Sequence, residues 1–225
     1  MKLSHPIRVL LLGAPGSGKG TQTSRLLKDF PINSLSSGDI LRSQIKERTP
    51  VGITAQEYIT NGSLVPDKVM IDLITGHLKT HNWLNSSTNW LLDGFPRTKP
   101  QAIELNKVLG SRSCPLNLVV ELDVPQSLIL QRIEARWVHL NSGRVYNLDY
   151  NPPKVPYKDD ITGEPLTKRD DDTAAVFQKR LDGYNEEIKG LRQVYEEEGV
   201  LFKISGETSD IIYPQLKQLV LDKFS

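Results

Sequence analysis

The fold is decided by the stretch Gly13-Ala14-Pro15-Gly16-Ser17-Gly18-Lys19-Gly20-Thr21. It follows a short continuous apolar run at residues 7–12, which predicts a buried parallel strand, and it precedes a stretch compatible with a helix. Glycines allow the backbone to wrap closely around a phosphate, and their N–H groups together with the next helix N-terminus attract negative charge. The sequence therefore predicts a phosphate-binding loop, in which Lys19 reaches the β- and γ-phosphates of a nucleotide.

The position after the lysine departs from the strict motif of such loops. That motif has Ser or Thr directly after the lysine, whereas Gly20 intervenes here before Thr21. The departure puts direct Mg²⁺ binding by a loop hydroxyl in doubt. We therefore expect the Mg²⁺ of a bound nucleotide to be held mostly through water, with Asp93 as the nearby carboxylate.

Similar apolar runs recur along the chain and alternate with helical stretches. They are Trp90-Leu91-Leu92, Leu118-Val119-Val120 and Val200-Leu201-Phe202. The alternation predicts an α/β fold, with a parallel sheet flanked by helices on both faces. The clearest helix is expected from about Thr173 to Glu198, where apolar residues recur at spacings of three and four.

Two segments differ from this alternating pattern. Residues 36–65 are helical in character but interrupted by Pro50, Gly52 and Gly62. From Val138 to Asp172 the composition shifts to Gly, Pro, Asn, Asp and Thr, which predicts a small insert of short β-hairpins. We expect one domain with its core at residues 1–35, 66–134 and 173–225, a helical insert at 36–65 and a β insert at 135–172.

Composition narrows the possible functions. A chain of 225 residues suits one domain, and a net charge of +1 gives no general attraction for nucleic acid or anionic membranes. The early apolar run is far shorter than the roughly 20 residues of a membrane span, so no membrane insertion is expected. Cys114 is the only cysteine, which fits a reducing compartment. The first 28 residues carry basic side chains and no acid; this fits either an uncleaved organellar import signal or simply a phosphate-binding start.

The sequence resembles the adenylate kinase family over nearly its whole length. The family's phosphate loop reads G-x-P-G-x-G-K-G-T, as the opening stretch does, and Asp93-Gly94-Phe95-Pro96-Arg97 resembles its most specific signature. Ser36-Ser37-Gly38-Asp39-Ile40-Leu41-Arg42 and Gly62-Ser63-Leu64-Val65-Pro66-Asp67 look like the start and end of its AMP-binding insert. Ser142-Gly143-Arg144-Val145-Tyr146 looks like part of its long lid.

The resemblance implies roles for individual residues. The AMP-binding residues would be Ser37, Arg42, Ser63, Leu64, Val65, Gly94, Phe95, Pro96, Arg97, Gln101, Arg169 and Arg180. The donor-binding residues would be Gly16, Ser17, Gly18, Lys19, Gly20, Thr21, Arg136, Val145, Tyr146 and Thr208. The catalytic cations would be Lys19, Arg97, Arg132, Arg136, Arg169 and Arg180.

These cations agree with the chemistry of transfer between nucleotides. The acceptor phosphate is largely ionised at neutral pH, because its second pKa is about 6, so no general base is needed. The catalytic tasks are to neutralise charge and to align the phosphates, which Lys19, Mg²⁺ and guanidinium groups can do. Arg132 and Arg136 are four residues apart, so we expect them to point together from one helical face.

Four residues occupy positions where related lids bind zinc. They are His139, Ser142, Asp159 and Thr162, at two x-x spacings. Because His139 is the one strong potential ligand among them, we expect a hydrogen-bonded network and no zinc.

The donor is the most specific prediction. Ala135-Arg136-Trp137 resembles the GTP:AMP phosphotransferases of the mitochondrial matrix, and Thr208 replaces a lysine common in bacterial ATP users. This predicts reversible γ-phosphate transfer from Mg-GTP, or from ATP or ITP, to AMP by a monomer in the mitochondrial matrix, with the cytoplasm as the alternative. Trp137 could instead merely pack the lid hinge. An ATP:AMP adenylate kinase, a kinase for UMP or CMP, and a P-loop nucleotide-dependent switch or binding module remain as alternatives. The long insert speaks against the UMP or CMP kinase, and the missing Asn-Lys-x-Asp loop speaks against the switch.

Overall fold

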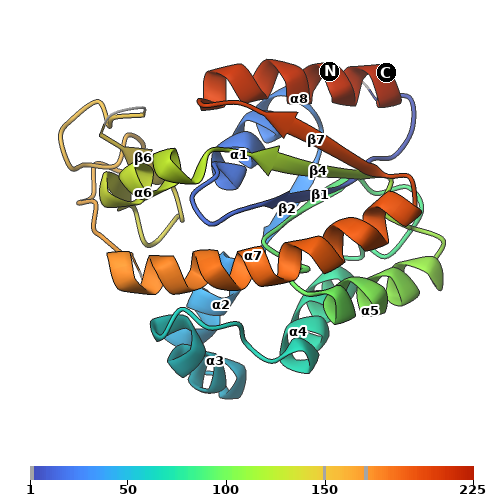
Figure 1. The fold of residues 1–225 in the computed structure, drawn as a ribbon, viewed down its shortest axis with the longest axis horizontal. Coiled ribbons are helices and arrows are strands. Elements are labelled where there is room, and N and C mark those ends of the chain that lie inside the picture. Colours follow the sequence, from blue (N-terminus) through green and yellow to red (C-terminus); the bar gives the residue numbers. More distant parts are fainter. Residues whose placement is uncertain (1–2, 149–150, 170–171) are drawn as a thin grey trace.

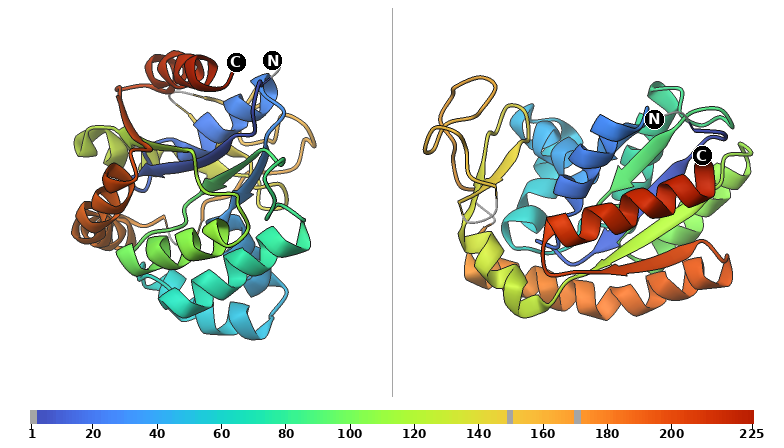
Figure 2. Two further views of the ribbon diagram at one scale, coloured as in Figure 1. Left: turned by 90° about the vertical axis from the view of Figure 1, so that its right-hand side faces the viewer. Right: turned by 90° about the horizontal axis from the view of Figure 1, so that it is seen from above.

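The computed structural model describes residues 3–148, 151–169 and 172–225. Its centre is a five-stranded parallel sheet in the order β2-β3-β1-β4-β7, with helices on both faces (Figures 1 and 2). The strands are β1 (Arg8–Gly13), β2 (Asn33–Ser36), β3 (Trp90–Asp93), β4 (Leu118–Asp123) and β7 (Leu201–Ser205). This confirms the predicted α/β fold, and each predicted apolar run lies in or adjoins a strand.

Eight helices are present in the described part of the chain. They are α1 (Lys19–Asp29), α2 (Ser37–Lys46), α3 (Pro50–Thr60), α4 (Asp67–Thr80), α5 (Lys99–Gly110), α6 (Gln126–Glu134), α7 (Ala174–Glu197) and α8 (Ser209–Phe224). None of these helices combines the length and the apolar character needed to cross a membrane.

Successive side chains of β1 point to opposite faces of the sheet, so the strand contributes to two separate hydrophobic cores. Leu10 and Leu12 pack with buried residues of α4, α5 and the C-terminal half of α7. Val9 and Leu11 pack on the other face with α1, α6 and α8. A strand buried on both faces explains why the sequence shows a continuous apolar run there.

Helix α7 contributes to both cores. Phe177 and Leu181 belong to the core that contains α8, whereas Ile188 and Leu191 belong to the core that contains α4. The helix therefore passes along the β7 side of the sheet (Figure 1). Its predicted bounds and apolar stripe are confirmed, and Thr173 caps it by accepting a hydrogen bond from Val176 N at 3.3 Å.

An ion pair fixes α7 to the sheet. Glu121 of β4 is 2% exposed and accepts a hydrogen bond from Arg192 Nε at 2.7 Å and a second from Arg192 Nη2. Tyr184 OH donates to the same carboxylate at 3.4 Å. Two parallel bonds to a buried carboxylate set the position of the helix along the strand.

Residues 36–65 form α2 and α3, broken where the sequence predicts. Pro50 is the first residue of α3 and Thr49 caps it. A Cβ on Gly52 would lie only 1.9 Å from Gln44 O, so only glycine allows the two helices to pack this closely. Gly62, with φ of 68°, follows the end of α3.

The second excursion contains little regular structure. Its strands β5 (Arg136–Val138) and β6 (Val145–Asn147) pair antiparallel, and isolated bridges such as Val138–Thr167 hold the remainder. One hairpin and irregular turns replace the several hairpins expected. Parts of the predicted segment, residues 149–150 and 170–171, lie outside the described residues.

Candidate active site

The loop between β1 and α1 has the geometry of a phosphate cradle. Gly16 and Gly18 have φ of 80° and 94°, values that favour glycine. A Cβ on Gly13 would lie 2.6 Å from Ser17 Oγ. The Ser17 hydroxyl is buried and has no hydrogen-bond partner within the described structure. A buried hydroxyl without a partner inside this loop is available to a phosphate oxygen.

Lys19 lies folded back on the loop. Its Nζ donates to Gly13 O at 2.7 Å and to Ala14 O at 3.0 Å. Burial, and to a smaller extent the charges of Arg97, Arg180 and Arg136, lower the pKa of Lys19 to about 8, while the charge of Asp93 opposes the shift. The structure thus brings four of the predicted catalytic cations close enough to influence one another.

Asp93 ends β3 beside the start of α1. A Cβ on Gly20 would lie 3.9 Å from Asp93 Oδ2, so the carboxylate faces the first turn of that helix. Burial raises the pKa of Asp93, and the charges of Lys19 and Arg97 oppose the rise. A partly desolvated carboxylate next to a phosphate cradle fits a Mg²⁺ ion, which favours oxygen ligands.

The segment after Asp93 folds against α2. Ser37 Oγ donates to Gly94 O at 2.7 Å, and Arg97 Nε donates to the same oxygen at 2.7 Å. Arg97 N donates to Gln101 Oε1 at 2.7 Å. Phe95 and Pro96 are buried, so they can offer a ligand mainly their main chain. Six predicted AMP-binding positions therefore meet at the carboxyl end of β3.

A second group of arginines lies between the two excursions. Arg42 Nη2 donates to Asp39 Oδ1 at 2.5 Å. Burial, and then the charges of Arg42 and Arg136, lower the pKa of Arg169 to about 10. The charges of Asp172 and Asp39 oppose this shift, so nearby acids offset part of the positive charge. Burial of several arginines close together favours a bound anion such as a phosphate.

Arg132 and Arg136 do not lie on one helical face, and that expectation was wrong. Helix α6 ends at Glu134, so Arg136 belongs to β5 and points elsewhere. Arg136 forms two hydrogen bonds with Asp172, one of them from Nε at 2.8 Å. Arg132 instead donates to Glu207 O.

The predicted donor residues divide into two groups. Thr208 caps α8, and a Cβ on Gly18 would lie 3.6 Å from the neighbouring Ser209 Oγ, so this turn lies beside the phosphate loop. Tyr146 is 5% exposed and its hydroxyl donates to Asp159 Oδ1 at 2.8 Å. Its ring therefore packs inside the β excursion, and only its main chain is available to a nucleotide. Val145 is exposed.

The turn at residues 63–65 lies close to α7. A Cβ on Gly62 would lie 2.8 Å from Val176 O and 3.2 Å from Arg180 Cγ. Val65 is buried, while Ser63 and Leu64 are partly exposed. The predicted AMP-binding backbone is thus next to the helix that carries Arg180.

The four positions of the possible zinc site are joined by hydrogen bonds, as predicted. His139 Nδ1 and Ser142 Oγ are 2.7 Å apart, and Thr162 Oγ1 donates to Asp159 Oδ2 at 2.9 Å. Arg144 Nε and Nη2 donate to Asp159 at 2.7 and 2.6 Å and hold the pKa of that carboxyl far below its usual range.

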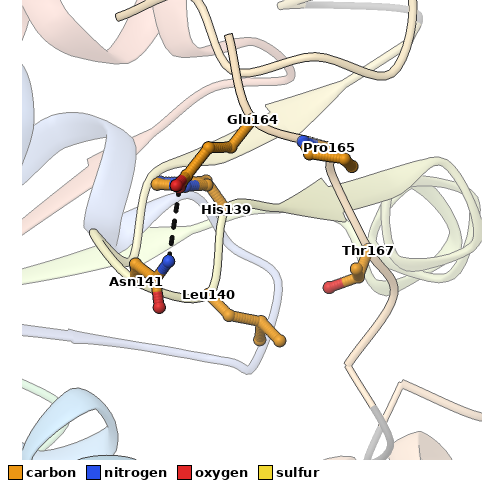
Figure 3. A pocket seen from close by; sticks show the side chains of 6 residues that line it. All are labelled: His139, Leu140, Asn141, Glu164, Pro165 and Thr167. Carbon is orange, nitrogen blue, oxygen red and sulfur yellow. Dashed lines mark hydrogen bonds and ion pairs between the residues drawn. The ribbon is translucent and has the colours of Figure 1, made fainter. Parts of the chain in front are cut away.

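A small cavity of about 250 Å³ opens beside this network (Figure 3). Its lining includes Asn141, whose Nδ2 donates to Glu164 Oε2 at 3.3 Å, and His139, which also binds Glu164. The cavity belongs to the β excursion and not to the phosphate loop.

Comparison with known proteins decides the family. The family model of adenylate kinase matches residues 11–200. The chain belongs to the adenylate kinase family. A mitochondrial GTP:AMP phosphotransferase of Saccharomyces cerevisiae is 59% identical over 223 residues, which cover 99% of this chain and 95% of the relative. An adenylate kinase of Vanderwaltozyma polyspora is 44% identical over 197 residues, 88% of this chain and 87% of the relative.

This member of the adenylate kinase family, a phosphotransferase, also contains site residues to which the sequence analysis assigned no role. Asp172 pairs with Arg136 across 36 positions of sequence. Asp67 Oδ1 accepts hydrogen bonds from Gln101 Nε2 at 2.8 Å and Thr98 Oγ1 at 3.0 Å, and so orients the predicted AMP ligand. Acids that hold arginines or amides leave no local spacing pattern, so their roles could not be predicted from the sequence.

Proposed function

We propose that this protein reversibly transfers the γ-phosphate of Mg-GTP to AMP, giving GDP and ADP. The observation that carries the proposal is a cluster of four cations at the phosphate loop. Arg97, Arg136 and Arg180 lie close enough to Lys19 for their charges to lower its pKa. GTP is chosen as donor because the S. cerevisiae relative, at 59% identity, is named for transfer between GTP and AMP.

The proposed chemistry requires positive charge and alignment. Main-chain N–H groups of residues 16–21 and Lys19 would bind the donor phosphates, and Lys19 would leave its loop carbonyls to do so. Arg136, Arg169 and Arg180 would stabilise charge on the phosphoryl group during transfer. Arg132, which donates to Glu207 O, would hold the turn next to the donor nucleotide in place.

Asp93 would hold Mg²⁺, mostly through water, next to the donor phosphates. When bound, the ion supplies positive charge to the β- and γ-phosphates. Gly20 adds no side chain in the space that separates Asp93 from the loop, which leaves room for coordinated water.

The acceptor would occupy the carboxyl end of β3 beside α2. Arg97 and Arg42 would bind the AMP phosphate, while Ser37 and Gln101 would position its nucleoside with the main chain of residues 63–65 and 94–96. Each of these groups comes from a rigid element or is fixed by a hydrogen bond, which suits a site that must align two phosphates.

We further propose that residues 36–65 and 135–172 act as two inserts that close over the nucleotides. Contacts between them support this: Lys46 Nζ donates to Asn141 Oδ1 at 3.3 Å, and a Cβ on Gly143 would lie 3.5 Å from the Asp39 carboxylate. Closure would exclude water, which otherwise competes with AMP as acceptor.

The proposed location is the mitochondrial matrix. The S. cerevisiae relative is named mitochondrial, and the basic start of this chain fits import. We propose that the protein is a monomer. We also propose that it binds no nucleic acid, in line with the net charge of +1.

Initial rates with purified protein test the proposed function. GTP, ATP, ITP and CTP are each combined with AMP, UMP and CMP, and kcat/KM is measured for every pair. GTP with AMP should be the best pair. A GTP-to-ATP ratio at or below one with saturating AMP would instead identify an ATP:AMP adenylate kinase, as the V. polyspora relative is named. Turnover that AMP fails to stimulate would favour a nucleotide-dependent switch.

A further inference from the structure

The donor nucleoside should extend toward the β4 and β7 side of the sheet. The phosphate loop follows β1 in the middle of the order β2-β3-β1-β4-β7 (Figure 1). The insert proposed for AMP follows β2, at the opposite edge. Because the γ-phosphate has to face the acceptor, the rest of the donor leads away from β2. Ligands of such sheets bind at the carboxyl ends of the strands, so the turn at residues 206–208, directly after β7, lies where the donor base is expected.

Contacts fix this turn beside the phosphate loop. Ser209 Oγ would be 3.6 Å from a Cβ on Gly18, and Ser209 O accepts a hydrogen bond from Arg25 Nη1 at 3.0 Å. Arg132, a predicted catalytic cation, donates to Glu207 O. The main chain of the turn is therefore held by α1 and α6 together.

Three carboxylates lie in or next to this turn, and they differ in their partners. Asp123 Oδ2 is 3.0 Å from Lys203 Nζ, and Asp210 Oδ1 is 2.6 Å from Arg25 Nη2. The side chain of Glu207 is exposed and has no hydrogen bond or ion pair with any residue that the structure describes. Glu207 thus offers a charged acceptor on a fixed main chain to a ligand.

We propose that the Glu207 carboxylate reads the donor base by accepting hydrogen bonds from N1–H and the N2 amino group of guanine. Guanine presents these two donors side by side, which matches the two oxygens of a carboxylate. Adenine presents an acceptor at N1 and no amino group at C2. The lone pair of adenine N1 would therefore face a carboxylate oxygen, and the two acceptors would repel each other. Glu207 is then the residue that favours GTP over ATP. The inference rests on the proposed GTP:AMP activity.

The test is Glu207→Gln, which keeps the shape of the side chain and replaces one acceptor oxygen with an NH₂ donor. The kcat/KM for GTP should fall about tenfold or more, the size of a lost hydrogen bond to a charged group, while that for ATP should rise, because the new NH₂ can donate to adenine N1. Xanthosine triphosphate has an oxygen at C2, to which the new NH₂ can donate, so its kcat/KM should rise. In the unchanged protein ITP, which lacks the N2 amino group, should lie between GTP and ATP.

Asp210→Asn is the matched control. Asp210 lies three residues from Glu207, and its carboxylate is paired with Arg25. The change removes the same charge from a carboxylate that already has a partner, so the GTP-to-ATP ratio should stay the same. Melting temperature and the KM for AMP should be unchanged in both variants.

Two results with Glu207→Gln would overturn the inference while leaving GTP:AMP transfer intact. One is an unchanged GTP-to-ATP ratio with no gain for xanthosine triphosphate. The other is an equal loss for all four donors, which would make Glu207 a structural part of the turn. If the unchanged protein does not prefer GTP, the proposed function itself fails.

Discussion

Replacing Asp172 with Asn should destabilise the protein strongly, and more so without nucleotide than with it. The side chains of Asp172 and Arg136 are 2% and 14% exposed, and they share two hydrogen bonds. Removing one partner of a buried ion pair costs about 3–5 kcal/mol, because it leaves the other charge buried and unpaired. For a chain of this size 1 kcal/mol corresponds to about 2–4 °C, so the melting temperature should fall by about 6–20 °C.

Nucleotide should reverse much of this loss. In the proposed complex the donor phosphates become the partners of Arg136, so the missing carboxylate matters less. By linkage, the variant should then gain more stability from saturating GTP than the unchanged protein does. Thermal melting with and without GTP measures both effects.

Asp182→Asn serves as the control for charge alone. Asp182 is an exposed acid of α7 that accepts a hydrogen bond from Gln178 Nε2 at 2.9 Å, and its replacement should change the melting temperature by only about 1 °C or less. An equal fall for Asp172→Asn with and without GTP would refute the exchange of partners at Arg136.

Three more predictions concern the two nucleotide sites and one turn. The charged form of Lys19 binds phosphate, and its pKa in the free protein is lowered to about 8, so kcat/KM for the donor should fall as the pH rises through about 8. A flat pH profile would contradict this role. Lys19→Ala should nearly abolish turnover without changing the melting temperature. Arg97→Ala should weaken AMP more than the donor in separate titrations, since Arg97 is fixed beside Ser37 by Gly94 O, and an equal loss would place Arg97 between the two sites. Gly62→Ala should cost about 1–3 kcal/mol more in urea unfolding than Gly163→Ala. Both glycines have positive φ, but only at Gly62 would the new Cβ meet a main-chain oxygen, at 2.8 Å, so equal costs would contradict a steric cause.

The sequence predicted those parts of the fold that depend on local patterns. Strands β1, β3, β4 and β7 each contain a short run of consecutive apolar residues, and α7 has a long apolar stripe and a threonine cap. The edge strand β2, Asn33–Ser36, has one buried apolar residue and was missed. Its hydrogen bonds to β3 are a tertiary feature that residue pattern does not record.

The candidate site divides in a similar way. The phosphate loop was recognised because glycine positions and a lysine must occur at fixed spacing. The partners of the cations, by contrast, come from distant segments: Asp172 for Arg136, and Glu207 O for Arg132. The expected helical pairing of those two arginines was wrong because α6 ends at Glu134, a boundary that their four-residue spacing does not reveal.

We expect a change at the Glu121–Arg192 ion pair, which anchors α7 to β4, to shift Arg180 at the other end of the helix. Arg180 lies twelve residues from Arg192, or about 18 Å at about 1.5 Å per residue. A tilt of about 5° about Arg192 then moves Arg180 by about 1.6 Å, well beyond the tolerance of about 0.5 Å for catalytic groups. Turnover should therefore be sensitive to substitutions at this ion pair, far from both nucleotides, and a crystal structure of a Glu121→Gln variant with both nucleotides bound would show whether the helix has tilted.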